Sequence, residues 1–512
     1  MKKLLALILT LSLLAAAGIV SVAHADDPVT LSLFVDETWW LYSDWSGTMP
    51  KWFTEQTGIT FDVTKAADVN ELDMMVASGT CPDIVVTSKF NLMSSDYVCY
   101  DWDSLIEQYN IDWQIHPAYK FVNRGVDGKM YTIMVGWSAD YEYEKYPGIN
   151  PEGECATARS DILEACLAKV GIEKITTVEE LEAVFAACKE LYPEVTPYTF
   201  NPQWNNWVYT LYGAANGGFV DNDGKAQLWI NQPELKTALM TLNKWYREGY
   251  MLAENYGWTS ADTQSEWAVA GNAFICAALT NYSDNFDAAC MDANVDYRWT
   301  PVTDIRTEDS AVWNTSTGWR GCFITKNCSN PEAAIKAMQF LYGKEESGYP
   351  MLWGVEGTDW QWNEDHTLAI FNYGTEDQAL KQERQLYWGW LGHDGISNNM
   401  AYAANEKTRM GLDWVGSITK RNPVLGLIMN SMDSESREYV IYQQLVELED
   451  NYLAKIGTAA TAEEAEKLYD EMIKIAQDLG AQQVEDWANA RYPELIKEYD
   501  AVKSIGAEGW ER

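Results

Sequence analysis

Short strand-like and helix-like patterns alternate over residues 31–86, and this alternation constrains the fold more than any other feature of the chain. The strand patterns, in which apolar residues alternate with polar ones or form a short run, cover residues 31–35, 60–63 and 84–86. The helical patterns lie between them, over residues 49–56 and 70–78, and each ends at a glycine suited to a left-handed C-cap. This order predicts an α/β fold with a doubly wound parallel sheet, and such sheets bind ligands at the carboxyl ends of their strands.

The remainder of the chain is expected to be mixed in its middle and helical at its C-terminal end. Thr177 and Glu180 form a capping box ahead of an amphipathic helix, and residues 219–229 have the pattern of a hairpin. Asp221 and Asp223 resemble the start of a calcium loop, but no glutamate stands at the twelfth position, so no calcium is predicted there. Residues 313–327 are predicted to be β-rich. Helices are predicted over residues 233–246, from Pro331 onward and from about Ser436.

The chain is strongly acidic, with 76 Asp and Glu against 37 Lys and Arg and a net charge of −39. Such a field repels phosphate backbones and anionic lipid heads, so binding to nucleic acid or to a membrane surface is not expected. There are only 4 His, and no P-loop, HExxH or GxSxG motif occurs. No catalytic residue, metal site or cofactor is therefore predicted, although a glycosidase-like pair of carboxylates stays open among so many acids.

The first 25 residues have the three parts of a secretory signal peptide. Lys2 and Lys3 precede an apolar run over residues 4–22, and Ala23-His24-Ala25 is an A-x-A cleavage site. The alternative is an uncleaved anchor helix, because the apolar run is somewhat long. No cysteine stands at the cleavage site, so no lipid anchor is predicted. We expect an exported protein, either periplasmic or secreted.

Nine cysteines follow the signal segment, and export permits disulfides. The pairings expected first join neighbours in the sequence, namely Cys155/Cys166, Cys276/Cys290 and Cys322/Cys328. An odd count leaves at least one thiol free in a monomer. The favoured interpretation, however, is that most of the nine are small buried apolar side chains, with one or two bridges among them.

Tryptophan is in excess, at 24 residues, and many of these residues stand beside Asn, Asp, Glu or Gly and not at core spacing. The clusters are Trp39/Trp40/Trp45, Trp204/Trp207, Trp313/Trp319, Trp353/Trp360/Trp362 and Trp388/Trp390. A flat apolar ring suits the apolar face of a sugar, and short polar side chains suit its hydroxyls. The clusters together predict a carbohydrate cleft, while for any single Trp the alternative is packing inside the core.

Five stretches carry a resemblance to a known family, in order along the chain. They are Phe34-Val-Asp-Glu-Thr-Trp-Trp40, Met75-Val-Ala-Ser-Gly-Thr-Cys-Pro-Asp-Ile-Val85, Asp127-Gly-Lys-Met-Tyr-Thr-Ile133, the run from Gly318-Trp319 to Leu341, and Trp353-Gly-Val-Glu-Gly357. With these stretches the chain resembles the extracellular solute-binding proteins, family 1, which serve ABC sugar importers. The branch that it resembles includes binders of alginate and other uronic-acid oligosaccharides.

The resemblance implies a two-lobed periplasmic-binding-protein fold, type II-like, whose hinged lobes close on a ligand. It assigns residues 26–136 and 303–358 to an N-terminal lobe, and residues 137–302 and 359–512 to a C-terminal lobe. It also implies an oligosaccharide ligand, the permease subunits of an ABC transporter as partners, and a monomer. The alginate binders carry a calcium loop after the capping-box helix; that place reads Leu191-Tyr-Pro-Glu-Val-Thr-Pro197 here, so no ion site is expected.

The predicted ligand contacts follow strand ends and aromatic clusters by position. The aromatic rings would stack on sugars, while Glu37, two asparagines and Arg320 would bind hydroxyls. Arg320 or Lys89 would instead pair with a carboxylate if the sugar carries one. The predicted set is Glu37, Trp39, Trp40, Lys89, Phe90, Trp137, Trp204, Asn205, Asn281, Tyr282, Trp319, Arg320 and Trp388.

Two other functions stay open from the sequence. A secreted carbohydrate-active enzyme would also carry an aromatic cleft, but it would consume its ligand. A receptor of the same fold for a peptide or a polyamine is the other alternative, because an acidic cleft suits a polyamine. The negative net charge favours a neutral sugar over a uronic one only weakly, since local charges override net charge.

Overall fold

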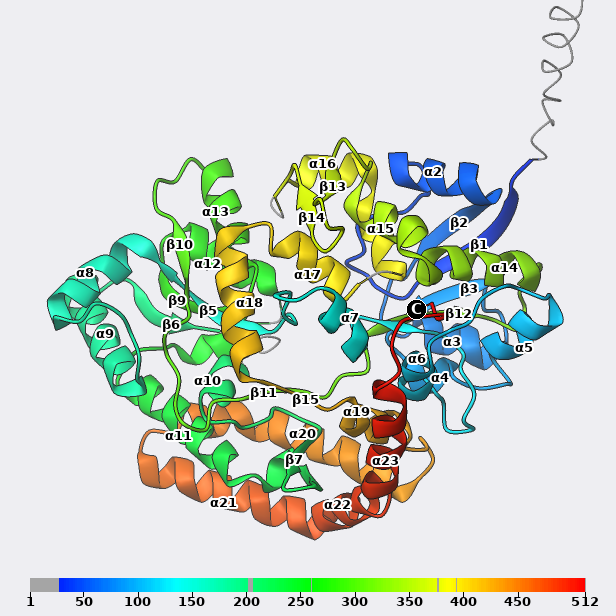
Figure 1. The fold of residues 1–512 in the computed structure, drawn as a ribbon. Helices are drawn as coiled ribbons and strands as arrows, with labels where there is room; N and C mark the ends of the chain where they lie inside the picture. The colour runs from blue at the N-terminus through cyan, green and yellow to red at the C-terminus, as the bar shows by residue number, and fades with distance from the viewer. Residues whose placement is uncertain (1–26, 201–205, 259, 375–376, 393, 512) are drawn as a thin grey trace, which may run out of the picture.

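The computed structural model describes residues 27–200, 206–258, 260–374, 377–392 and 394–511 (Figure 1). The chain forms an α/β fold with two main sheets, as predicted. We call the five-stranded sheet the first sheet, and its strand order is β2-β1-β3-β12-β4. Its strands are β1 (Val29–Val35), β2 (Ile59–Lys65), β3 (Ile84–Thr87), β4 (Met134–Val135) and β12 (Arg320–Ile324).

The first three strands and the helices between them form as the sequence predicts. β1 pairs in parallel with both β2 and β3, and α2 (Thr48–Thr57) and α3 (Glu71–Ser78) connect these strands. Gly58 and Gly79 follow the two helices with φ values of 68° and 67°, in the left-handed region that glycine enters without a steric cost. The predicted β-α-β-α-β unit is therefore confirmed.

The first sheet is mixed and not wholly parallel, which corrects the prediction. β12 lies between β3 and β4 and is antiparallel to both of them. Cys322 pairs with Val86, and Arg320 pairs with Val135. Because β12 runs against β1 and β3, the residues just before it lie at the edge of the sheet where β1 and β3 end.

A second, four-stranded sheet has the order β10-β5-β9-β6. Its strands are β10 (Trp299–Val302), β5 (Glu154–Arg159), β9 (Ala273–Leu279) and β6 (Thr196–Thr199). The helices α8 (Ser160–Val170) and α9 (Val178–Leu191) pack on each other beside it. The predicted capping box opens α9, since the Thr177 hydroxyl accepts a hydrogen bond from the Glu180 backbone N–H at 3.1 Å. The Glu180 carboxylate in turn accepts from the Thr177 N–H at 3.3 Å.

The two sheets are linked by several crossings of the chain. Two short strands from these crossings, β11 (Val312–Asn314) and β15 (Thr419–Arg421), pair in parallel with each other. In the part of the chain between β11 and β15, α14 (Pro331–Met338) packs on β12. The 3₁₀ segment η4 (Leu386–Leu391) packs on β12 and on α15 (Glu345–Trp353). Farther along, α18 (Glu406–Ile418) packs on β10 and α13 (Tyr282–Asp292) of the second sheet.

The C-terminal segment is helical, as predicted. It consists of α20 (Arg437–Gly457), α21 (Ala462–Leu479), α22 (Ala481–Asn489) and α23 (Tyr492–Lys503). α20 and α21 pack on α11 (Pro233–Arg247), while α22 packs on the predicted hairpin of β7 (Phe219–Asn222) and β8 (Lys225–Leu228). α23 returns to the first sheet and contacts α6 (Pro117–Val122), so the tail ties the two halves together (Figure 1).

All nine cysteines are free and buried, so the pairings Cys155/Cys166, Cys276/Cys290 and Cys322/Cys328 are wrong. Nearness in sequence fails as a guide because packing of the helices decides which thiols meet. The Cys166 thiol lies within hydrogen-bond reach of Cys188, across α8 and α9. The favoured interpretation, that most cysteines are small buried apolar residues, agrees with this burial, but the one or two bridges that it included do not form.

Within the described ranges, no helix is both long enough and apolar enough to cross a bilayer. The predicted signal peptide, residues 1–25, lies outside the described residues.

Candidate ligand-binding site

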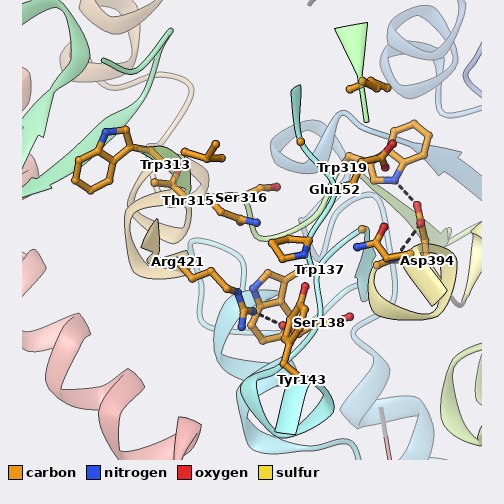
Figure 2. Close-up of a pocket in the computed structure, with 18 residues that line it drawn as sticks. Trp137, Ser138, Tyr143, Glu152, Trp313, Thr315, Ser316, Trp319, Asp394 and Arg421 are labelled. Carbon is orange, nitrogen blue, oxygen red and sulfur yellow. Dashed lines mark hydrogen bonds between the residues drawn. The ribbon is translucent and has the colours of Figure 1, made fainter. Parts of the chain in front are cut away.

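A cavity of about 450 Å³, which we call the main cavity, is lined by residues that adjoin strands of both sheets; Figure 2 shows its lining side chains. Residues 136–138, directly after β4, and Trp319, directly before β12, line it from the first sheet. Residues 151–153, directly before β5, and Leu279 at the end of β9 line it from the second sheet. The cavity therefore lies at strand ends of both sheets, which is where open α/β folds bind their ligands.

Trp319 is fixed in the wall of the main cavity by two contacts. Its indole N–H donates to the Asp394 carboxylate at 2.8 Å, as Figure 2 shows. Gly136 lies so close to the ring that a Cβ there would be 2.4 Å from Trp319 Cδ1, and its φ is 86°. Only glycine fits that backbone position, so the sequence around β4 keeps the indole pressed into the wall.

Arg421, the last residue of β15, forms the opposite wall. Its guanidinium donates to the Asp140 carboxylate at 2.7 Å and to the Ser138 carbonyl oxygen at 2.5 Å. The same group lies 4.3 Å from the ring centroid of Tyr143, which also lines the cavity. Arg421 thus joins the β11/β15 crossing to the segment after β4, and its charge is balanced by Asp140.

Glu152 adds an acid of unusual charge state. Burial, and then the nearby charge of Asp394, raise the pKa of Glu152 to about 8. A carboxyl group with that pKa is mostly protonated at neutral pH and donates a hydrogen bond as well as accepting one. Asp394 holds Trp319, so the main cavity contains one carboxylate engaged with an indole and one carboxylic acid that suits a hydroxyl partner.

A second cavity of about 340 Å³, the side cavity, adjoins the main one. The two cavities share Gly153, Leu279, Val312, Trp313 and Thr315 in their walls. Trp313 therefore stands at the junction, where its indole N–H donates to the Gly213 carbonyl oxygen at 2.8 Å. The Lys420 ammonium lies 4.5 Å from the centroid of the Trp313 ring and helps to fix it. Together the cavities make one elongated groove.

A cage of four indoles lies beside the main cavity, formed by Trp39, Trp40, Trp390 and Trp319. Neighbouring rings around this cage have centroids 5.6, 6.3, 6.4 and 6.3 Å apart. The guanidinium of Arg320 lies inside, 3.7 Å from the Trp319 centroid and 4.5 Å from that of Trp40. Arg320 is fully buried, while Trp39 is 48% exposed and stacks on Trp319 at an interplanar angle of 15°.

The structure brings some of the predicted site residues together. Trp137 and Trp319 line the main cavity. Glu37 and Trp39 lie next to Trp319, and Glu37 accepts a hydrogen bond from the Trp39 indole N–H at 2.7 Å. Arg320 is close to the rings of Trp39 and Trp319, but its burial separates it from solvent.

Other predicted residues do not line either cavity. Trp40 and Trp388 are fully buried and touch each other in the core, and Phe90 is buried against Phe323. Lys89 is engaged with Asp73 at 2.6 Å and Asp36 at 3.4 Å. Asn281 and Tyr282 lie at the start of α13, beyond the cavity walls. Trp204 and Asn205 lie outside the described residues.

Sequence reasoning did not select several residues that line the main cavity. These residues are Tyr143, Glu152, Asp394, Asn399 and Arg421. They come from crossings between the sheets, and no strand-end rule points to a crossing. Trp313 had a usable signal, because it forms a sequence cluster with Trp319, but its place at the junction of two cavities required the fold.

The lining of the groove combines aromatic and polar side chains. In the part of the chain that the structure describes, no group of three or more His, Cys, Asp or Glu side chains is placed to hold a metal ion. The site offers aromatic rings, one carboxylic acid, amides and hydroxyls along the groove that the main cavity and the side cavity form together. Such a lining suits a ligand with many hydroxyl groups and apolar ring faces.

Comparison with known protein families and structures gives one consistent result. The family model described as "Bacterial extracellular solute-binding protein" matches residues 42–348. No curated protein sequence matches the chain.

Solved structures similar to this chain include several sugar-binding proteins. The alginate-binding protein AlgQ2, solved without calcium ion, is 17% identical with a TM-score of 0.65, over 91% of this chain and 98% of that one. The ABC-transporter substrate-binding protein FusA of S. pneumoniae, solved with kestose, is 14% identical with a TM-score of 0.66, over 91% and 99%. The N-glycan transport protein NgtS of Streptococcus pneumoniae is 18% identical with a TM-score of 0.58, over 92% and 99%. At these identities the likeness establishes the two-lobed fold.

Proposed function

Because the chain belongs to the bacterial extracellular solute-binding protein family, whose members bind and do not catalyse, we propose that it captures an oligosaccharide between its two lobes and delivers it to an ABC importer. The observation that carries this proposal is the elongated groove between the sheets. A groove of two adjoining cavities with Trp319 and Trp313 along it fits a chain of sugar rings better than a single ring.

The proposed contacts divide by chemistry. Trp319, Trp313 and the exposed Trp39 supply stacking surfaces, because each is only partly buried. Glu152 and Asn399 supply polar partners for sugar hydroxyls. Trp137 closes the wall of the main cavity behind them. From the sequence-based set, this proposal keeps Trp39 and Trp319 as direct contacts and treats Trp137, Glu37 and Arg320 as their support.

We also propose the division of the chain into lobes. The first lobe includes the first sheet, α14 and α15, and the second lobe includes the second sheet and α18. Residues 378–391 belong to the first lobe in this proposal, because α16 (Gln378–Arg384) packs on α2, and η4 on β12. This differs from the limits that the resemblance implies for residues 359–512. The β11/β15 pair and the segment after β4 form the hinge.

The remaining parts of the proposal concern the location and the partners. The family is extracellular, and the N-terminal 25 residues have the pattern of a signal peptide. The protein is thus proposed to be exported to the periplasm or secreted, to act as a monomer and to dock on the permease subunits of its importer.

A thermal-shift screen of the purified protein tests the function. The panel is nystose, maltotetraose, cellotetraose, xylotetraose, tetramannuronate, pentaglycine and spermidine. A sugar at 100 times its dissociation constant adds about 2.7 kcal/mol to the free energy of unfolding and raises Tm by several degrees. We expect at least one tetrasaccharide to raise Tm and to be recovered intact by chromatography.

Two results would contradict this function. Breakdown of the bound sugar would identify a carbohydrate-active enzyme. A rise in Tm with pentaglycine or spermidine and with none of the sugars would leave the fold assignment intact and identify a ligand of another chemical class.

A further inference from the structure

Arg320 occupies an unusual position for a charged side chain. It is fully buried, and none of its three guanidinium nitrogens has a hydrogen-bond acceptor among the described residues. A buried charge is costly unless other groups compensate it. Here four indoles surround the guanidinium with centroids between 3.7 and 5.9 Å from Cζ, and a cation over an indole face is stabilised by the ring electrons.

Carboxylates complete the surroundings of Arg320 without bonding to it. Glu37 and Asp394 are near enough to act on its charge, as are the thiol of Cys322 and the phenol of Tyr342. Each carboxylate instead accepts an indole N–H, Glu37 from Trp39 at 2.7 Å and Asp394 from Trp319 at 2.8 Å. The cation therefore lies between two carboxylates, each of which fixes one ring of the stacked Trp39–Trp319 pair.

We propose that Arg320 is a positioning residue of the sugar groove: its positive charge, held among the four indoles, stabilises the Glu37 carboxylate, and Glu37 in turn holds Trp39 stacked over Trp319 as a platform for a sugar ring. Arg320 does not touch the ligand, because the indoles cover it. The inference rests on the proposed function only for the sugar. The link from Arg320 to Glu37 to Trp39 exists without any ligand.

The electrostatics of Glu37 agree with this geometry. Burial raises the pKa of Glu37 above its ordinary value, and the positive charge of Arg320 is the largest influence in the opposite direction. The other charged neighbours of Glu37 are Asp36 and Lys89, which are paired with each other. Without Arg320 the burial effect would be opposed less, the pKa of Glu37 would rise further, and the negative charge that strengthens its hydrogen bond from Trp39 would be weakened.

Fluorine NMR of the full protein labelled with 5-fluorotryptophan tests the link directly. The Trp39 resonance is assigned by its loss in Trp39→Phe, and its shift is followed from pH 4 to pH 8. In Arg320→Met we expect the midpoint of that titration to rise by about one pH unit or more, since a neighbouring opposite charge lowers a carboxyl pKa by about 1–3 units. Arg320→Lys keeps the charge, so its midpoint should stay near that of the wild type.

Two controls separate positioning from general damage. Glu37→Gln, alone or combined with Arg320→Met, should abolish the titration of the Trp39 signal. Arg159→Met removes another cation from an aromatic face, that of Tyr297 at 4.5 Å in the second lobe, and should leave the Trp39 midpoint unchanged. The same midpoint in wild type and Arg320→Met would overturn the proposal, as would a titration that persists in Glu37→Gln.

A binding measurement completes the test. Calorimetry with each tetrasaccharide of the panel should show affinity in Arg320→Met about tenfold or more below wild type at pH 6, with the deficit narrowing toward pH 8 as Glu37 ionises. A uniform deficit at every pH would reject the positioning role. If no sugar binds the wild type, the proposed function fails, and the NMR titration still decides the role of Arg320.

Discussion

At the scale of single residues, Trp313 has the most consequential position in the groove. It lines both cavities, and its indole is held from two sides by Gly213 and Lys420. A ring fixed in this way loses little conformational entropy when a sugar stacks on it. A ligand that extends through both cavities must pass Trp313, whereas a short ligand can occupy the main cavity alone.

We therefore expect Trp313→Ala to weaken the binding of a tetrasaccharide by about 1–3 kcal/mol and that of the matching disaccharide by less, as measured by calorimetry. Trp487→Ala is the matched control. Trp487 on α22 also has a cation over its ring, Arg491 at 4.1 Å, but it lies outside both cavities, so affinity should not change. Equal losses for the two sugar lengths would contradict the extended ligand.

Residue-scale prediction from the sequence had a clear limit. The strand-end rule and the aromatic clusters led to Trp39 and Trp319, because those residues sit where a sheet presents its ligand edge. The same rule also selected Trp40, which the fold turns into the core, since adjacent residues at a strand end point to different sides. The sequence did not indicate that Arg421 and Asp394 belong to the site, because their hydrogen-bond partners come from segments far away in the chain.

At the scale of elements, α20 carries a buried acid that makes the stability of the C-terminal segment depend on pH. Glu449 is 6% exposed; its Oε2 accepts from the Trp229 indole N–H at 2.5 Å, and its Oε1 has no partner among the described residues. Burial raises the pKa of Glu449 to about 7. The folded state therefore holds the proton more tightly than the unfolded state, and stability is lost as pH rises from the ordinary carboxyl range through about 7.

Glu449→Gln should remove this loss. We expect the variant to be more stable than wild type by about 3 kcal/mol at pH 8.5 and to differ little at pH 4.5, because the pKa of Glu449 rises from an ordinary 4.5 to about 7 and one pKa unit corresponds to about 1.4 kcal/mol. Urea unfolding at both pH values measures the difference. Glu447→Gln, at an exposed position on the same helix, is the control and should match wild type throughout. If wild type instead gained stability relative to Glu449→Gln between pH 4.5 and pH 8.5, the predicted direction of the pH dependence would be wrong.

The elements themselves were largely predictable, and their directions were not. Capping residues and periodicity located α2, α3, α9 and the C-terminal helices, because these signals are local. Periodicity says nothing about which way a strand runs beside its neighbour. β12 was expected as part of a β-rich segment, but its antiparallel place between β3 and β4 follows from the route of the chain through the second sheet.

At the scale of the whole molecule, nine buried thiols are distributed through both sheets and their helices. Burial raises the pKa of Cys155 and Cys276 to about 12 and that of Cys322 to about 11. The thiolate is the form that attacks a disulfide or an oxidant, so these groups stay unreactive in the folded protein. The core therefore does not depend on cross-links.

We expect protein purified without reductant to take up nine alkyl groups when it is denatured and alkylated, as counted by mass spectrometry. Its Tm should be the same with and without dithiothreitol. A sample reduced before alkylation is the reference for complete labelling. Fewer adducts in the unreduced sample, together with a Tm that falls on reduction, would show that a disulfide forms, and the Cys166 and Cys188 neighbours would be the first pair to examine.

The position of β12 affects the order in which the molecule can assemble. β12 completes the first sheet beside β3, yet it follows β3 in the chain only after the whole of the second sheet. During synthesis, which starts at the N-terminus, the edge of β3 stays unpaired until the residues between β3 and β12 have been added. Pairings between segments so far apart in the sequence form slowly. The first sheet cannot be completed before the residues of the second sheet have been synthesised. A truncated chain that ends before residue 320 therefore exposes the unpaired edge of β3, and unpaired strand edges promote aggregation.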